Sequence, residues 1–271
     1  MSVGCKVEAV RDGVGGGQRM VLDVPEEVPL ELRFNGTAYA TMMVTPDDLD
    51  DFVVGFSLTE AIIEKGEAIK ALTVVSQEGG MVADVQLHGA DYAALLRGGE
   101  RSIPGRTGCG ICGVRTLDEA RRALNPAPSG PQICFSAIQA ALATLDDQKS
   151  GNAARRGVHA AALCSRHGDI MHLREDVGRH NALDKLIGAL IRSPESLDIA
   201  DGFCLVTSRC SYEMVQKAVR AGFSTLVAIS APTALALRVA EEAGLTVIAL
   251  ARKDGCFRFE TRQALAQEIA V

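Results

Sequence analysis

The 271-residue chain lacks a long apolar segment that is free of charge. A membrane-spanning helix needs about 20 predominantly apolar residues, and the most apolar region, residues 221–251, contains Arg238, Glu241 and Glu242. The N-terminus also lacks the basic segment followed by an apolar run that marks a secretory signal. We therefore expect a cytoplasmic protein that neither spans nor binds a membrane.

An excess of basic side chains is absent as well. The chain has 28 Lys and Arg against 34 Asp and Glu and a net charge of −6, so it carries no overall attraction for nucleic acid or an anionic membrane. The apolar fraction of 47% and the charged fraction of 23% are close to globular averages and exclude a disordered, collagen-like or coiled-coil chain. The length fits one large domain or two ordinary ones.

The eight cysteines lack the arrangement of a structural zinc site. Such a site has four protein ligands, usually two CxxC pairs or one pair with two histidines, and the chain contains a single CxxC. We therefore expect no structural metal. Disulfide frameworks are typical of short secreted chains, so we expect reduced thiols, with Cys134, Cys164 and Cys204 packed in the core as small apolar side chains.

The first hundred residues have the pattern of a mixed sheet. Strand-like runs at 31–34 and 39–44 flank Asn35-Gly36, a pair that is typical of a hairpin turn. A second pair of strands is predicted at 69–75 and 81–87. Both pairs lie close together in the sequence, which favours local antiparallel pairing.

Two helices are expected in the same half of the chain. The first begins with Thr45 as its N-cap and Pro46 in its first turn. The second begins at the capping box of residues 116–119. The apolar stripe of the first helix is formed by Phe52, Phe56, Ala61 and Ile62.

A segment rich in Pro, Ser and Gly at residues 125–131 indicates a boundary. We divide the chain there into an N-terminal α+β lobe, 1–125, and a C-terminal α/β domain, 132–271. Alternation of strands and helices after residue 158 predicts a layered, partly parallel sheet and hence a mixed α/β fold. The predicted strands are 160–164, 169–173, 203–207, 225–229 and 246–251, and the predicted helices are 180–191, 212–221 and 234–243.

The sharpest chemical signal is Cys109-Gly110-Ile111-Cys112-Gly113, within a glycine-rich stretch. A CxxC can be half of a metal site, a redox dithiol or a sulfur-carrying nucleophile, and the spacing alone leaves these open. The flanking glycines favour a mobile thiol that reaches different partners. Arg106 would stabilise a thiolate three residues later, or is simply a solvated loop residue.

Two further clusters have the composition of an anion site. In the run 174–181, Arg179, His180 and the amides of a helix start could hold an anionic ligand; a helix cap with a solvated face is the alternative. Turns after three predicted strands form the other cluster, because ligands of open α/β sheets bind beyond the strands' carboxyl ends. These turns are 207–213, 230–233 and 252–253, and the alternative is ordinary strand-to-helix turns.

Together these motifs resemble the FdhD family of sulfur carrier proteins, which are required to make active formate dehydrogenase. The resemblance extends over nearly the whole chain. The matching segments include Cys109–Gly113 and the SYEMVQK run at 211–217. The CxxC alone would be a weak signal, and the most specific segments are the EDVGRHNALDK run at 175–185 and the SAPTALA run at 230–236.

The resemblance implies a sulfurtransferase that accepts persulfide sulfur from a cysteine desulfurase. It passes the sulfur to the molybdenum cofactor, in its bis-guanine-dinucleotide form, before insertion into the formate dehydrogenase apoprotein. A cytidine-deaminase-like three-layer core and a homodimer are also implied. Deaminase chemistry is not expected, because zinc deaminases need His-x-Glu followed by Pro-Cys-x-x-Cys and His159 lacks that Glu. A cofactor-binding chaperone without sulfur transfer is the alternative.

If the chain acts as the resemblance implies, Cys109 is the expected persulfide carrier and Cys112 assists it. GDP is the expected mimic of the cofactor's nucleotide. The family's Gly-Phe-x-Arg segment is Ala249-Leu250-Ala251-Arg252 here, without the aromatic, and its Ser-Gly-Arg turn is Ser208-Arg209-Cys210. The expected cofactor-binding residues are Arg179, His180, Arg209, Ser230, Ala231, Pro232, Thr233, Leu250, Ala251, Arg252, Lys253, Asp254 and Gly255.

Overall fold

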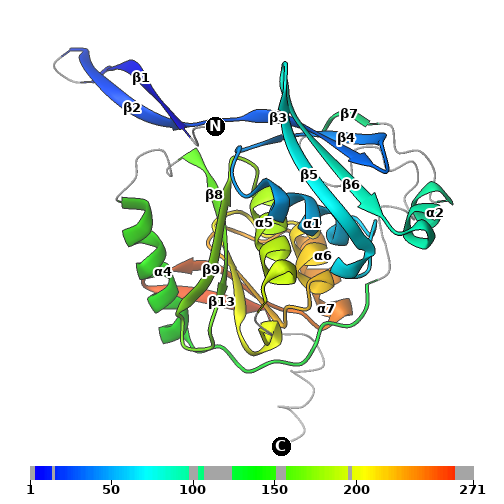
Figure 1. Cartoon of the computed structure of the whole chain (residues 1–271). Coiled ribbons are helices and arrows are strands. Elements are labelled where there is room, and N and C mark those ends of the chain that lie inside the picture. Colours follow the sequence, from blue (N-terminus) through cyan, green and yellow to red (C-terminus); the bar gives the residue numbers. More distant parts are fainter. Residues whose placement is uncertain are drawn as a thin grey trace, which may run out of the picture.

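The computed structural model describes residues 4–13, 16–97, 103–106, 124–150, 157–194 and 197–259. Within these residues the strands form a hairpin, a five-stranded sheet and a six-stranded sheet (Figure 1). The hairpin consists of β1 (Gly4–Arg11) and β2 (Gln18–Pro25). No helix among the described residues is long and apolar enough to cross a membrane.

The five-stranded sheet contains the two hairpins that the sequence predicts. Its order is β5-β6-β3-β4-β7. At the first turn Asn35 and Gly36 both have positive φ, 49° and 79°, as a two-residue turn that matches the strand twist requires. The strands are β3 (Val28–Phe34), β4 (Thr37–Val44), β5 (Ile69–Gln77), β6 (Gly80–Leu87) and β7 (Ile103–Arg106).

Helix α1 (Leu49–Thr59) packs on this sheet, but the prediction of its ends was wrong. Its N-cap is Asp48 rather than Thr45. The Thr45 hydroxyl accepts a hydrogen bond from the Val177 N–H instead (3.1 Å), so this side chain is used in a tertiary contact. Phe52 and Phe56 are buried as predicted, whereas Ala61 lies beyond the helix and is exposed.

The six-stranded sheet confirms the predicted alternation. Its order is β13-β12-β11-β10-β8-β9, with β10, β11 and β12 parallel and the outer pairs antiparallel. Predicted and observed bounds differ by a few residues at most, apart from β13, which was not predicted. The strands are β8 (His159–Cys164), β9 (Ile170–Asp176), β10 (Phe203–Val206), β11 (Thr225–Ala228), β12 (Thr246–Arg252) and β13 (Gly255–Phe259).

Helices cover both faces of this sheet, which gives a three-layer arrangement (Figure 1). One face carries the three predicted helices, α5 (Arg179–Arg192), α6 (Tyr212–Arg220) and α7 (Ala234–Ala243). The other carries α4 (Phe135–Ser150), which was not predicted although Ile138, Ala141, Leu142 and Leu145 form an apolar stripe. The remaining short elements are η1 (Gly66–Ala68), α2 (Gly89–Arg97) and η3 (Ile199–Asp201).

Helices α1 and α5 cross in direct backbone contact. A Cβ added at Gly55 would collide with the Asp184 carbonyl, and one added at Gly188 would collide with the Asp51 carbonyl. The absence of a side chain at both positions therefore allows the close approach. This contact joins the helix of the five-stranded sheet to a helix of the six-stranded sheet.

Candidate functional site

The predicted site turns gather at one edge of the six-stranded sheet. The parallel strands β10, β11 and β12 bring their carboxyl ends to that edge. Strand β8 runs antiparallel to β10, and β9 runs antiparallel to β8, so β9 also ends there. The starts of α5, α6 and α7 consequently lie along the same edge.

The turns after β10 and β11 are bonded to each other. The Cys210 N–H donates to the Ala231 carbonyl (3.2 Å), and the Thr233 N–H donates to the Cys210 carbonyl (3.0 Å). Thr233 also caps α7, because its side chain accepts from the Ala236 N–H. The Arg209 side chain is exposed beside this contact, so it is available to a ligand.

The end of β12 joins the same group of turns. The Leu250 N–H donates to the Ser230 carbonyl (3.2 Å), and the Arg252 guanidinium donates to the Ile229 carbonyl. The ladder is irregular between Ala249 and Arg252, and Leu250 has a φ of 54°. A left-handed backbone costs a residue with a Cβ roughly 1–2 kcal/mol, so the surrounding contacts hold Leu250 in a strained conformation.

The following turn, which includes Asp254 and Gly255, is fastened to α4. Lys253 Nζ lies 3.2 Å from an Asp146 carboxylate oxygen, and the Lys253 carbonyl accepts from the Gln139 amide (2.8 Å). The Lys253 side chain is 81% exposed. Lys253 therefore contacts the helix on the opposite face of the sheet from α6 and α7.

At the start of α5 the two predicted donors differ in their surroundings. His180 is buried, with Nε2 3.9 Å from a Glu213 carboxylate oxygen. Burial lowers the pKa of His180, so its imidazole is neutral near pH 7. Burial alone would raise the pKa of Glu213, but the nearby His180 and hydrogen bonds from the backbone hold it at about 2. Arg179 Nε is buried without a hydrogen-bond partner among the described residues.

Asp176 and Lys185 form an ion pair with both side chains fully buried (2.8 Å). The carboxylate of Asp176 also accepts from the Thr45 N–H (3.0 Å), the Gly178 N–H (2.8 Å) and the Asn181 amide (2.9 Å). Lys185 donates to the Thr45 carbonyl (2.9 Å). The pair thus ties the loop after β4 to the start of α5.

A second buried pair joins three helices. Lys217 of α6 lies 2.8 Å from Asp184 of α5, and the Thr59 hydroxyl at the end of α1 donates to Asp184 (2.7 Å). Burial raises the pKa of Asp184 to about 6, although Lys217 beside it acts in the opposite direction. Much of the 175–185 run is therefore interior polar structure, an arrangement that the sequence analysis did not consider.

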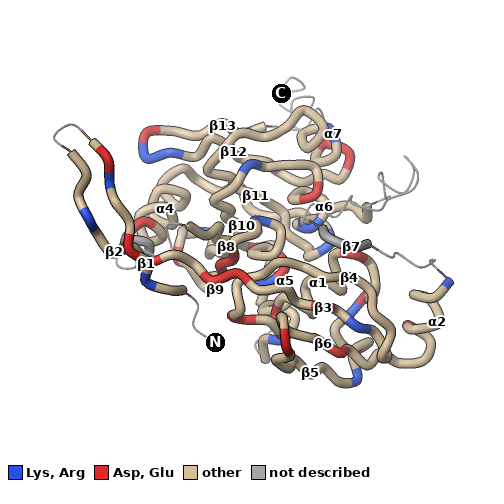
Figure 2. Tube along the Cα trace, turned by 90° about the horizontal axis from the view of Figure 1, so that it is seen from above, with Lys and Arg blue, Asp and Glu red and all other residues tan. Residues whose placement is uncertain are grey.

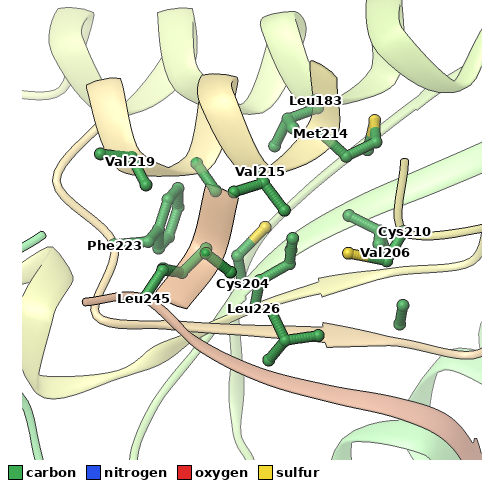
Figure 3. Packing of buried hydrophobic residues seen from close by; sticks show 14 of the residues in the cluster. Leu183, Cys204, Val206, Cys210, Met214, Val215, Val219, Phe223, Leu226 and Leu245 are labelled. Atoms are coloured by element: carbon green, nitrogen blue, oxygen red, sulfur yellow. The ribbon is translucent and has the colours of Figure 1, made fainter. Parts of the chain in front are cut away.

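The cysteine predictions are confirmed at two positions and wrong at one. Cys164 and Cys204 are buried, and burial raises the pKa of Cys164 to about 12. Cys210 is buried with Cys204 in the core between the sheet and α5–α7 (Figure 3). Cys134, directly before α4, is exposed, and hydrogen bonds from the Ser136 hydroxyl and the Ala137 N–H lower the pKa of its thiol.

Cys109, Cys112 and the helix predicted from residues 116–119 lie outside the described residues. The last described residue before them is Arg106, at the end of β7, where it pairs with Met42 of β4. The carbonyl of the next residue, Met43, accepts from the Asn181 amide of α5 (2.8 Å). The chain therefore enters the CxxC segment from a strand that is paired with β4, and the end of β4 is bonded to the start of α5.

Comparison with known proteins identifies the family. The sequence profile of the FdhD/NarQ family matches residues 25–265. The chain belongs to this family. It is 41% identical over 243 residues to the sulfur carrier protein FdhD of Bordetella petrii, which covers 90% of this chain and 86% of that protein.

A second relative and a solved structure agree with this assignment. The sulfur carrier protein FdhD of Xanthomonas euvesicatoria is 42% identical over 269 residues, covering 99% of this chain and 95% of the relative. A crystal structure from Desulfotalea psychrophila, named as a formate dehydrogenase accessory protein, superposes with a TM-score of 0.72 at 24% identity. The superposition covers 96% of this chain and 98% of the chain in that crystal structure, so the two proteins share a fold. Both of these relatives carry the name sulfur carrier protein.

Proposed function

We propose that the protein takes persulfide sulfur from a cysteine desulfurase and delivers it to the molybdenum cofactor for formate dehydrogenase. Cys109 carries the sulfur, and Cys112 assists. The observation that carries the proposal is the gathering of three polar turns at one sheet edge in a member of a sulfur carrier family. The cofactor, in its bis-guanine-dinucleotide form, is the acceptor substrate at that edge.

Loading requires a thiolate. The Cys109 sulfur attacks the terminal sulfur of the donor's cysteine persulfide, a new S–S bond forms, and the donor's S–S bond breaks. The donor cysteine leaves as a thiolate and takes up a proton from solvent. A cation near the attacking sulfur increases the thiolate fraction, and Arg106 precedes Cys109 by three residues.

Nucleotide phosphates have suitable donors at the edge. The exposed Arg209 side chain, the buried Arg179 Nε and the N–H groups at the starts of α6 and α7 can all donate to an anion. Neutral His180 contributes a hydrogen bond rather than charge. The turn Leu250–Gly255 would line the remaining side, with GDP as the mimic of the cofactor's guanine nucleotide.

Sequence separation supports delivery to this edge. Cys109 is the third residue after Arg106, and such a stretch spans at most ~11 Å. Strand β7 is paired with β4, whose end is bonded to α5. The cytidine-deaminase-like character of the core, the division at 1–125 and 132–271, the cytoplasmic location and a homodimer belong to the same proposal.

The test is labelling with a cysteine desulfurase and radiolabelled cysteine, followed by peptide mapping. We expect the added sulfur on Cys109 and its loss in Cys109→Ala. Cys134→Ala is the matched control, since Cys134 is an exposed thiol of lowered pKa and should not affect loading. Label on Cys134, or activation of formate dehydrogenase by unlabelled Cys109→Ala, would contradict the proposal; the latter result would favour a cofactor-binding chaperone.

A further inference from the structure

Buried polar atoms without a hydrogen-bond partner among the described residues gather at the start of α5. They include Arg179 Nε, His180 Nε2 and Asn181 Oδ1. The side chains of His180 and Asn181 are well buried, since the two residues are only 4% and 2% exposed. Folded proteins pair nearly all of their buried polar groups, so such a group calls for an explanation such as a bound molecule. The start of α5 therefore has hydrogen-bonding capacity for a polar ligand.

Helices α5 and α6 face each other in two polar layers. His180 lies one turn before Asp184 on α5, and Glu213 lies one turn before Lys217 on α6. In the inner layer Lys217 Nζ is 2.8 Å from an Asp184 carboxylate oxygen, and both side chains are buried. In the outer layer, at the helix starts, His180 Nε2 is 3.9 Å from a Glu213 carboxylate oxygen, which is too far for a direct hydrogen bond. The inner pair is closed, whereas the outer layer can still bind a ligand at the sheet edge.

Glu213 places a carboxylate in this outer layer. Its pKa of about 2 keeps it ionised near neutral pH, and an ionised carboxylate has about four acceptor positions. The Glu213 side chain is 14% exposed, so a ligand at the edge can reach it. A carboxylate repels a phosphate, and the first turn of α7, whose residues are all described, has no acidic side chain. The α7 side of the edge thus suits phosphates, and the α5–α6 side suits an uncharged polar group.

The outer layer combines donors with acceptors. Charges of both signs lie where β9 passes into α5 (Figure 2). Arg179 Nε donates, whereas the Glu213 carboxylate and Asn181 Oδ1 accept. The orientation of the Asn181 amide is fixed, because its NH₂ group donates to the Met43 carbonyl (2.8 Å) and to Asp176 (2.9 Å). A phosphate only accepts and would leave the acceptors unused, whereas a ring edge with adjacent N–H groups and a carbonyl oxygen uses both kinds.

We propose that the starts of α5 and α6 recognise the 2-amino-4-oxopyrimidine edge of the acceptor substrate. Glu213 accepts from the ring N–H and the 2-amino group, and Arg179 donates to the ring carbonyl oxygen. Guanine and pterin share this edge, and the acceptor contains both rings. The inference rests on the proposed function, because it assigns the orientation of that acceptor, with a ring between α5 and α6 and phosphates at the start of α7.

Ligand analogues test the proposal on the wild-type protein. Calorimetry compares GDP with IDP, which lacks the 2-amino group, and with ADP, which has an amino group in place of the carbonyl oxygen. We expect IDP to bind about tenfold and ADP about a hundredfold more weakly than GDP, because unmatched polar groups in a buried site are costly. Equal affinities for the three nucleotides would overturn the proposal.

A pterin distinguishes the two sources of the ring edge. If 6-hydroxymethylpterin competes with GDP, or binds where GDP does not, the pterin edge fits between α5 and α6. If GDP binds with the expected selectivity and the pterin does not compete, the place belongs to guanine. Binding of neither compound would overturn the proposal.

Glu213→Gln tests the residue. It keeps the size of the side chain but exchanges one acceptor oxygen for a donor, so GDP should bind about tenfold more weakly and lose its advantage over IDP. Pyrophosphate, which has no ring, should bind at least as tightly as to the wild type, because a nearby negative charge is gone. Glu242→Gln, at an exposed position of α7, is the matched control and should leave every affinity unchanged.

Tighter GDP binding by Glu213→Gln, or an equal loss for GDP and pyrophosphate, would overturn the proposal. The analogue series needs no variant and therefore decides the question even if Glu213→Gln does not fold. Persulfide loading of the wild type is measured in parallel without nucleotide. Loss of loading would count against the sulfur carrier function, whereas loss of ring selectivity with intact loading would count against this inference alone.

Discussion

Removal of the Lys217 ammonium should strongly destabilise the protein. In Lys217→Met the Asp184 carboxylate keeps its buried position but loses a cation at 2.8 Å, and Glu60, 3.6 Å from the same nitrogen, loses it too. Breaking one partner of a buried ion pair costs about 3–5 kcal/mol. That is a large part of the ~5–15 kcal/mol that typically separates folded from unfolded protein, and urea denaturation should show it as a lowered midpoint.

The pH dependence distinguishes this mechanism from a packing defect. In the folded protein the pKa of Asp184 is raised from 3.8 to about 6, so the folded state binds a proton more tightly than the unfolded state. Stability from this carboxyl is therefore highest below pH ~4 and falls by about 3 kcal/mol as pH rises to ~6. Without Lys217 the folded pKa should rise further, and the fall should continue above pH 6.

The difference between wild type and Lys217→Met should thus be larger at pH 8 than at pH 5. Asp184→Asn combined with Lys217→Met removes the buried charge of Asp184 but not that of Glu60, keeps an acceptor for the Thr59 hydroxyl, and should recover part of the loss. A loss below about 1 kcal/mol, or one that is equal at pH 5 and pH 8, would refute the reasoning.

Three further predictions concern single sites. Iodoacetamide should modify Cys134 in the native protein while the buried Cys204 reacts only after unfolding, as peptide mass spectrometry can check. Arg209→Ala and Arg252→Ala should each weaken GDP binding, measured by calorimetry, about tenfold to a hundredfold, since a charge-assisted contact contributes roughly 1.5–3 kcal/mol. Persulfide loading should stay intact in both variants. Unchanged GDP affinity in both would mean that the cofactor binds elsewhere. Leu250→Gly should raise the free energy of unfolding by up to about 1 kcal/mol, because glycine adopts the positive φ without strain.

The sequence predicts most strands and helices after residue 158 because their signals are local, although it misses α4 and β13. The helix at 234–243 has its predicted bounds, with Thr233 as cap and Gly244 at its end. The start of α1 was missed for a non-local reason: Thr45 and Pro46 have the composition of a helix start, yet the Thr45 hydroxyl bonds the Val177 N–H across the fold. The helix propensity of neighbouring residues carries no information about a hydrogen-bond partner that is distant in the sequence.

The candidate site was predictable to a similar extent. Turns after parallel strands converge by topology, so Arg209 and Ser230 could be grouped from the sequence. Burial of charge could not be predicted, because charged residues are usually exposed, and no pattern within α5 shows that Asp184 meets Lys217 some 33 residues later. The prediction for Cys134 was wrong in the opposite direction. Its apolar neighbours indicated a core position, and one of them, Ile133, is fully buried, but the Cys134 thiol is exposed.

The two buried pairs change how variants in the 175–185 run should be interpreted. Asp176–Lys185 holds the loop after β4 against α5, and Asp184–Lys217 holds the end of α1 against α5 and α6. Strand β4 also pairs with β7, from which the chain continues toward Cys109. A substitution at Asp176 or Lys185 can therefore reduce sulfur delivery by displacing the strand that precedes the carrier, without touching the cofactor. Such a variant would keep its GDP affinity while folded and lose stability, whereas a variant of the proposed cofactor contact Arg209 should lose GDP affinity at unchanged stability.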